Sequence, residues 1–364
     1  MATDSGSSPP RPGGSPSGFG GSPSGFDSSP GGLALASALA AGPVLLDGGL
    51  SNQLADQGCD LSDALWSARL LLDEPRQLVA AHRAYFEAGA QVATTASYQA
   101  SRPGFAARGV DAGKADRLLA LSVEVARLAA EEVSAELGDG RPRWVAASVG
   151  PYGAVLADGS EYRGHYGLSA SELAEFHRPR LEVLAAAGPD VLAVETVPDL
   201  LEAAVLADCV RGLGVPVWFS FSAADGLTRG GEPLSEVFAL VSEVPEAVAV
   251  GVNCCAPEEV TSAVALAAEV TGLPGVAYPN SGEGWDAAAR DWTGAAAFDP
   301  GLAADWVAAG ARLVGGCCRV GPAAIAELAA VAQAPPRWTE LPASTRPLVR
   351  SSGLSAAGRP AVWY

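Results

Sequence analysis

Two cysteine-containing segments are the part of this 364-residue sequence with the clearest capacity for chemistry. They are Gly251-Val252-Asn253-Cys254-Cys255 and, later in the chain, Gly315-Gly316-Cys317-Cys318. Each follows an apolar stretch, so each delivers thiols to the end of a buried strand. Thiolates gathered at one point bind soft metal ions, and with only three histidines in the chain zinc is the expected metal. The pattern predicts a zinc site formed by Cys254, Cys317 and Cys318.

Two other interpretations of these cysteines stay open. Free cysteine is commonly a small buried core residue, and neighbouring cysteines can form a vicinal disulfide or a redox pair. Two Cys-Cys pairs, each after a glycine-containing strand end, favour the metal. Three thiol ligands leave one tetrahedral position free, which is typical of catalytic zinc, and the flexible Gly-Gly pair would let Cys317 and Cys318 reach one ion. Cys255 has no evident place in such a site, and Cys59 and Cys209 have no evident partner.

The elements that would position these thiols alternate regularly from about residue 44 onward. Short β-branched runs predict eight strands, at 44–47, 91–96, 144–149, 191–196, 215–222, 248–253, 275–279 and 312–316. Stretches of helical period follow them, at 75–88, 112–137, 169–187, 198–213, 233–244, 257–271, 301–309 and 322–331.

Eight strand–helix units favour an α/β fold of the (β/α)₈ (TIM) barrel type, with a doubly wound open sheet as the alternative. In a barrel the carboxyl ends of the strands form one face, which holds the active site. Polar residues lie where that architecture requires, at the predicted strand ends. They are Asp47, Thr94, Thr95, Ser148, Glu195, Ser220, Asn253 and Cys317.

Composition bounds the remaining properties of the chain. A net charge of −18 argues against nucleic acid and anionic membrane surfaces as partners. No apolar run is long enough for a membrane helix, and the apolar segment 33–42 is predicted to be a helix leading into the domain. Reduced thiols indicate the cytoplasm. We expect a disordered Gly/Ser/Pro-rich tail at 1–32, the barrel at 33–334 and an extended tail at 335–364.

Six motifs stand in order along residues 40–333. They are Leu46-Asp47-Gly48-Gly49, Ala88-Gly89-Ala90 through Thr94-Thr95-Ala96-Ser97-Tyr98-Gln99, Ser148-Val149-Gly150-Pro151-Tyr152-Gly153, Glu195-Thr196, Gly251-Val252-Asn253-Cys254 and Gly315-Gly316-Cys317-Cys318. Together they resemble the homocysteine S-methyltransferase family. Two further segments, 159–162 and 278–283, resemble its branch that uses S-methylmethionine or S-adenosylmethionine.

The resemblance implies methyl transfer from a sulfonium to the thiol of L-homocysteine, giving methionine, with zinc on Cys254, Cys317 and Cys318. The partners would be small molecules: homocysteine and the donor. Zinc would keep the acceptor as a thiolate, and the neutral leaving thioether needs no general acid. Asp47 and Glu195 are candidates to hold substrate ammonium groups, and Asn253 either contacts substrate or supports Cys254. The other residues expected to line the pocket are Thr94, Thr95, Ser148, Tyr278, Asn280, Ser281 and Glu283.

Three alternative functions remain from the sequence. The same zinc could serve another small thiol or selenol, such as selenohomocysteine, or a betaine donor. A non-catalytic zinc-binding or storage protein is a third class, and it predicts a closed site with four ligands that includes Cys255.

Overall fold

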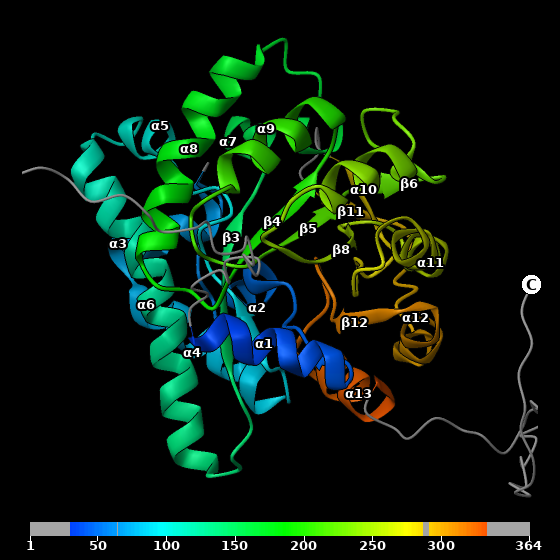
Figure 1. Cartoon of the computed structure of the whole chain (residues 1–364). Coiled ribbons are helices and arrows are strands. Elements are labelled where there is room, and N and C mark those ends of the chain that lie inside the picture. Colours follow the sequence, from blue (N-terminus) through cyan, green and yellow to red (C-terminus); the bar gives the residue numbers. More distant parts are fainter. Residues whose placement is uncertain (1–29, 64, 287–290, 333–364) are drawn as a thin grey trace, which may run out of the picture.

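Eight parallel strands form the centre of the molecule, and helices surround them (Figure 1). The computed structural model describes residues 30–63, 65–286 and 291–332. The predicted tails therefore lie outside the described residues, apart from the few positions next to the barrel. The strands are β1 (Val44–Leu45), β2 (Val92–Thr94), β3 (Trp144–Val149), β4 (Val191–Val197), β5 (Val217–Phe221), β8 (Ala247–Asn253), β9 (Gly275–Tyr278) and β12 (Ala311–Val314).

The sheet closes on itself. Hydrogen-bonded neighbours follow the order β1-β12-β9-β8-β5-β4-β3-β2. A parallel bridge between Leu46 and Val92 then joins the first strand to the second, supported by a 2.8 Å hydrogen bond from the Gln91 N–H to the Leu45 carbonyl. The predicted (β/α)₈ barrel is thus confirmed, and the open doubly wound sheet is excluded.

The eight predicted helices are present, and their ends follow local sequence signals. Pro75 begins the first of them, where its missing N–H costs no hydrogen bond. Asp111 caps the longest by accepting a hydrogen bond from the Lys114 N–H, and Gly138 ends it in a left-handed conformation. The helices are α4 (Pro75–Glu87), α6 (Ala112–Leu137), α8 (Ala170–Ala186), α9 (Leu200–Val210), α10 (Leu234–Ser242), α11 (Val260–Thr271), α12 (Ala303–Ala309) and α13 (Pro322–Ala332).

Buried side chains form two clusters, as the alternation of residues along a strand requires. The larger lies between the strands and the surrounding helices. The smaller fills the barrel interior and includes Val92, Trp144, Trp218 and Val276. Leu35 and Leu39 belong to this inner cluster. They come from α1 (Pro30–Ala41), the helix predicted to lead into the domain.

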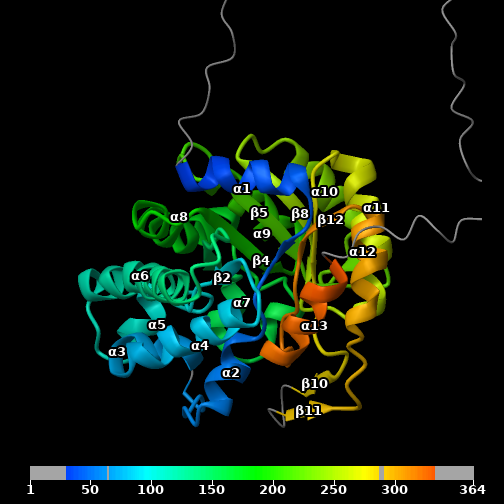
Figure 2. The same cartoon turned by 90° about the horizontal axis from the view of Figure 1, so that it is seen from below.

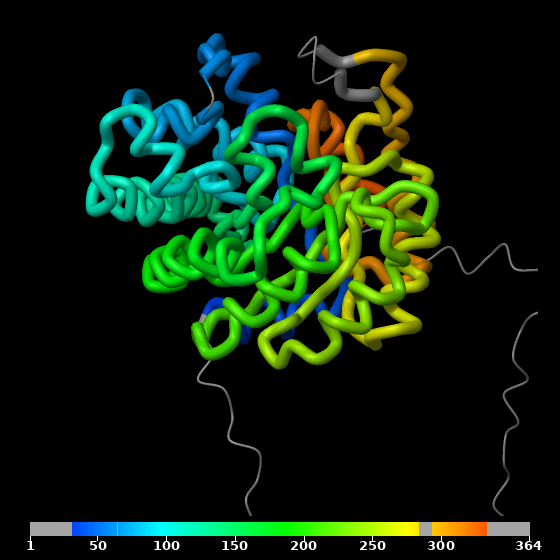
Figure 3. Tube along the Cα trace, turned by 90° about the horizontal axis from the view of Figure 1, so that it is seen from above, coloured from blue at the N-terminus to red at the C-terminus, as the bar shows by residue number. Residues whose placement is uncertain are grey.

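Helix α1 lies at one end of the barrel, opposite the end that carries α2 (Leu50–Asp56), β10 (Gly284–Asp286) and β11 (Asp291–Thr293), three of the short elements of the strand–helix loops (Figures 2 and 3). No described helix is long and apolar enough to cross a membrane. The 3₁₀ turns η3 (Pro257–Glu259) and η4 (Pro300–Leu302) overlap the starts of the helices predicted at 257–271 and 301–309, and the other short elements of the loops were not predicted. The remaining short elements are η1 (Trp66–Arg69), α3 (Leu70–Asp73), α5 (Arg102–Ala106), α7 (Tyr152–Leu156), η2 (Ser160–Tyr162), β6 (Ala223–Ala224) and β7 (Leu227–Thr228).

Candidate active site

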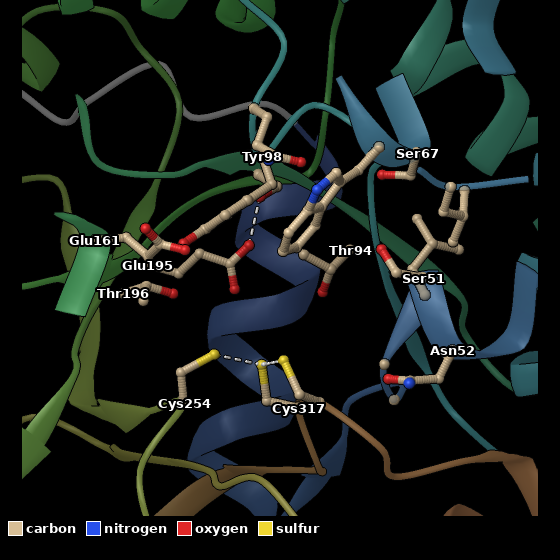
Figure 4. A pocket seen from close by; sticks show the side chains of 18 of the residues that line it. Ser51, Asn52, Ser67, Thr94, Tyr98, Glu161, Glu195, Thr196, Cys254 and Cys317 are labelled. Atoms are coloured by element: carbon tan, nitrogen blue, oxygen red, sulfur yellow. Dashed lines mark hydrogen bonds between the residues drawn. The ribbon is translucent and has the colours of Figure 1, made fainter. Parts of the chain in front are cut away.

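The structure brings the thiols of Cys254, Cys317 and Cys318 together at the carboxyl end of the barrel (Figure 4). Cys254 directly follows β8, and the other two follow β12. One strand, β9, separates these two strands in the sheet. The Cys254 and Cys317 sulfurs are 2.8 Å apart, those of Cys317 and Cys318 are 3.9 Å apart, and all three lie within 4.8 Å of one another.

This arrangement fits a zinc ion by both distance and charge. Tetrahedral zinc with Zn–S bonds of about 2.3 Å holds its sulfurs about 3.8 Å apart. This separation lies between the 2.8 Å of Cys254 and Cys317 and the 3.9 Å of Cys317 and Cys318. Hydrogen bonds from Cys254 and Cys317 lower the pKa of the Cys318 thiol, whereas hydrogen bonding to the neighbouring thiols and burial raise the pKa of Cys317. A cation is needed before all three sulfurs can be thiolates at once.

The two glycines before Cys317 permit close packing of the chain. Neither Gly315 nor Gly316 has a positive φ. The conformational freedom expected of the Gly-Gly pair is therefore not the reason that glycine occupies these positions. A Cβ at Gly315 would lie 2.7 Å from the Leu46 Cβ, and one at Gly316 would lie 2.3 Å from a Val320 methyl. Glycine is therefore required because the β12 end passes directly against β1 and the following turn.

The residues after β9 hold the cysteine loops through backbone contacts. The Asn280 side-chain oxygen accepts a 3.2 Å hydrogen bond from the Cys318 N–H, and the Ser281 N–H donates to the Cys318 carbonyl. The Ser281 hydroxyl in turn donates to Glu283, which also accepts from Arg319. Asn280, Ser281 and Glu283 are absent from the cavity wall, so the structure places them behind the thiols.

Asp47 is fully buried at the end of β1 and accepts three hydrogen bonds. They come from the Thr94 N–H at 2.7 Å, the Thr94 hydroxyl at 3.0 Å and the Tyr278 hydroxyl at 2.7 Å. Burial raises the pKa of Asp47 to about 7, although these donors oppose the rise. Tyr278 and Thr94 reach the cavity wall, whereas Asp47 lies just behind it.

Glu195 comes from the inward face of β4 and lines the cavity. It accepts a short hydrogen bond from the Ser148 hydroxyl, on the neighbouring strand β3. Burial raises the pKa of Glu195 to about 8, and the charges of Cys254 and Asp47 add to the rise. Thr95, on the same side, accepts a 3.1 Å hydrogen bond from the Ser148 N–H. A cationic group in the cavity would therefore restore the ionised form of Glu195.

Asn253 is buried, and both polar atoms of its side-chain amide are hydrogen-bonded to Thr196. Its oxygen accepts from the Thr196 N–H at 2.7 Å, and its nitrogen donates to the Thr196 hydroxyl at 2.8 Å. Thr196 has a φ of 61° and Cys254 a φ of 48°, both in the left-handed region that β-branched and other L-residues disfavour. Of the two roles expected for Asn253, this geometry corresponds to support of the Cys254 loop.

A cavity of about 500 Å³ opens above the thiols. Its titratable lining groups are acids, thiols and phenols, with no lysine, arginine or histidine among the lining residues. Several lining residues were not singled out from the sequence. Glu161 and Tyr98 lie within sequence segments that resemble the family, so the resemblance could have identified them. The lining residues between Leu50 and Ser67 belong to no such segment. The lining residues without a predicted role include Leu50, Ser51, Asn52, Ala55, Leu61, Ser62, Trp66, Ser67, Tyr98, Gln99, Glu161, Tyr162 and Thr196.

The remaining cysteines and the histidines lie outside the cavity wall. Cys255 is buried in the outer core cluster, and no described cysteine forms a disulfide. His82 is fully buried, and burial lowers its pKa to about 4. His177 contacts Glu202 at 2.8 Å inside the protein, and His165 contacts the Gly230 carbonyl near the surface.

Comparison with known proteins agrees with this site. The family model described as homocysteine S-methyltransferase matches residues 44–332. The chain is 47% identical to the homocysteine S-methyltransferase of Escherichia coli K12 over 79% of this chain and 94% of that one. It is 42% identical to the selenocysteine Se-methyltransferase of Brassica oleracea var. italica, over 78% and 87% of the two chains.

The solved structures include the same fold with a metal. The metallated form of the homocysteine methyltransferase MmuM from Escherichia coli matches with a TM-score of 0.71 at 45% identity, covering 79% of this chain and 96% of that one. The resemblance seen in six sequence motifs is therefore confirmed: this chain belongs to the homocysteine S-methyltransferase family.

Proposed function

We propose that this protein transfers a methyl group from a sulfonium donor, S-methylmethionine or S-adenosylmethionine, to the thiol of L-homocysteine and so forms methionine. The observation that carries the proposal is the convergence of three thiols on a cavity without a basic lining residue. Such a cavity favours cationic ligands, and both substrates bring an ammonium group while the donor brings a sulfonium as well.

Cys254, Cys317 and Cys318 would hold the metal, which we infer to be zinc because the donor set is three sulfurs. Bound there, zinc would act as a Lewis acid that lowers the pKa of an incoming thiol. Thiolates survive only under reducing conditions, so we expect the protein to work in a compartment such as the cytoplasm.

The chain's own residues would bind and orient the substrates. Glu195 faces the cavity as an acceptor for an ammonium group, and the Ser148 hydroxyl fixes its carboxylate. Asp47 would act through Tyr278 and Thr94, whose side chains it holds at the cavity wall. Holding the donor in line with the acceptor sulfur is the main contribution required, since the departing thioether is neutral and needs no proton.

A donor panel tests the reaction itself. Reduced, zinc-loaded protein is incubated with L-homocysteine and, in turn, S-methylmethionine, S-adenosylmethionine or betaine, and methionine is measured. We expect methionine with a sulfonium donor. Methionine from betaine alone, or from none of the three, would overturn the proposal.

The metal's role is tested with matched cysteine variants. Cys317→Ala should lose both bound zinc and methyl transfer, whereas Cys255→Ala, which changes a core cysteine outside the thiol cluster, should keep both. X-ray absorption at the zinc edge should show three protein sulfurs, with a fourth appearing only when homocysteine is added. Unchanged activity in Cys317→Ala, or four sulfurs without homocysteine, would contradict the assignment.

A selenol acceptor is the second candidate, and the similarity to a selenocysteine Se-methyltransferase favours testing it. Selenohomocysteine and selenocysteine offered as acceptors in the same assay would show whether the site accepts selenium in place of sulfur. Storage of zinc is disfavoured, because the fourth cysteine it requires lies in the core rather than in the three-thiol cluster.

A further inference from the structure

Glu161 is a buried acid at the cavity wall, and one of its carboxylate oxygens has no hydrogen-bond partner among the described residues. It is 7% exposed and comes from η2, the short 3₁₀ helix after α7. Its Oε2 atom has no hydrogen-bond partner among the described residues, although it is shielded from solvent. Glu195, the other acid lining the cavity, is held by Ser148, and Asp47 behind the wall is held by Thr94 and Tyr278.

No positively charged side chain stands beside this carboxylate at the cavity wall, and burial raises the pKa of Glu161 more than the charge of Arg163 lowers it. The lining residues include no lysine, arginine or histidine. Arg163, two residues along the chain, has a side chain that is 58% exposed and is directed to Asp158 at 3.6 Å. Leaving a carboxylate buried and unpaired is costly, so the position is suited to a ligand that carries the missing positive charge.

The chain also fixes where Glu161 stands. A Cβ at Gly153 would lie 2.5 Å from the Glu161 nitrogen and 2.6 Å from the Ser160 carbonyl carbon, so α7 packs directly on the backbone of this turn. Figure 4 shows Glu161 beside Glu195 and Thr196, on the side of the cavity that holds Cys254. The backbone that carries Glu161 is therefore fixed on the Cys254 side of the cavity.

We propose that Glu161 recognises the positive sulfur of the methyl donor and makes the protein prefer the sulfonium over neutral molecules of the same shape. The inference rests on the proposed function and assigns to Glu161 the electrostatic recognition of the donor's positive charge. It places the sulfonium, rather than the donor's ammonium group, at Glu161 because this acid lies on the Cys254 side of the cavity and keeps an oxygen without a hydrogen-bond donor, whereas the neighbouring Glu195 is already fixed by Ser148.

The chemistry of the transfer makes such an interaction useful. The donor's S⁺–CH₃ bond breaks and its electron pair stays on the donor sulfur, which becomes a neutral thioether. A new S–CH₃ bond forms with the electron pair of the acceptor thiolate, which becomes neutral as well. Glu161 therefore attracts the donor and loses that attraction once the methyl has moved, so the demethylated product leaves more readily than the donor.

A pair of ligands that differ only in charge tests the proposal. S-methylmethionine and its carbon isostere, 2-amino-5-methylhexanoate, have the same shape and the same ammonium and carboxylate groups. Calorimetry of zinc-loaded protein without an acceptor gives both affinities. In Glu161→Gln we expect the affinity for S-methylmethionine to fall at least about tenfold and that for the isostere to change less than about twofold.

Two further variants control for folding and for overall charge. Glu161→Asp keeps the charge and should retain most of the preference for the sulfonium. Glu175→Gln removes one charge from an exposed site on α8 and should leave both affinities unchanged. Equal weakening of the two ligands in Glu161→Gln, or an unchanged ratio of their affinities, would overturn the inference.

The outcome also separates this inference from the proposed function. If the wild-type protein transfers methyl groups from S-methylmethionine but Glu161→Gln keeps the wild-type affinity ratio, only the role of Glu161 is wrong. If the wild-type protein neither binds a sulfonium nor yields methionine, the proposed function fails and the inference fails with it.

Discussion

Replacing Asn253 by alanine should destabilise the protein strongly although the residue does not line the cavity. Its side chain ties the end of β8 to the end of β4 by two hydrogen bonds to Thr196, of 2.7 and 2.8 Å. Both residues are at most 1% exposed. Asn253→Ala therefore removes the acceptor of the Thr196 N–H and the amide donor to the Thr196 hydroxyl, at a residue that is only 1% exposed.

The expected loss follows from the two buried hydrogen bonds that are removed. A buried donor or acceptor that loses its partner costs about 1–3 kcal/mol, so two such losses cost about 2–6 kcal/mol together. Part of that loss is offset if Thr196 leaves its left-handed conformation, because this relieves a backbone strain of about 1–3 kcal/mol. We therefore expect the free energy of unfolding to fall by about 2–3 kcal/mol, which leaves the variant folded.

Urea unfolding of reduced, chelator-treated wild type and variant measures this difference without a contribution from metal binding. Thr196→Ser is the matched control, because it keeps both the N–H and the hydroxyl and should change the free energy of unfolding by less than about 1 kcal/mol. A loss below about 0.5 kcal/mol in Asn253→Ala would show that the two hydrogen bonds do not hold the strand ends together.

Three more outcomes are expected. Leu35→Ala should cost about 2–4 kcal/mol in the same urea experiment because Leu35 is buried against the barrel interior, whereas Leu33→Ala, at a position 57% exposed, should cost almost nothing. Arg180→Ala should lower the free energy of unfolding by about 3 kcal/mol or more, since the buried Arg180 donates to three backbone carbonyls of the loops after β2 and β3. As a control, Arg178→Ala removes an exposed ion pair and should lower it by less than about 1 kcal/mol. Burial raises the pKa of Glu195 to about 8, so between about pH 4.5 and pH 8 the folded metal-free protein keeps a proton that the unfolded chain has already released. The free energy of unfolding should therefore fall as the pH rises through this range. Glu195→Gln should lessen the fall, and an unchanged dependence on pH in urea unfolding of this variant would contradict the assignment.

Most of the barrel could be predicted because each of its elements carries a complete local pattern. The run 144–149 was predicted as a strand with the same bounds as β3, and 112–137 as a helix with the same bounds as α6. Period, capping residues and glycine at helix ends all agreed there. The helix α1 was also predicted, because its apolar composition is sufficient without any tertiary information.

The loops that complete the cavity could not be predicted in the same way. Helix α2 has seven residues, too few to show a reliable period, and it supplies cavity-lining positions such as Leu50 and Ala55. Asn280 and Asn253 act through hydrogen bonds to backbone and side-chain atoms far along the chain. A strand-end position indicates that a residue lies near the site, but it does not say whether its side chain faces the substrate or a neighbouring loop.

Strained backbone conformations at the cavity explain how strands of regular geometry present their side chains to one point. Seven non-glycine residues of the described chain have a positive φ, and Trp66, Thr196 and Cys254 among them line the cavity. Each of these conformations costs about 1–3 kcal/mol. A strand that continued past Asn253 would send the next side chain outward, away from the barrel axis. The left-handed turn at Cys254 ends that alternation and directs its thiol toward Cys317, while the hydrogen bonds of Asn253 hold the matching turn at Thr196. The strain is therefore a condition for bringing sulfurs from two non-adjacent strands within reach of one ion.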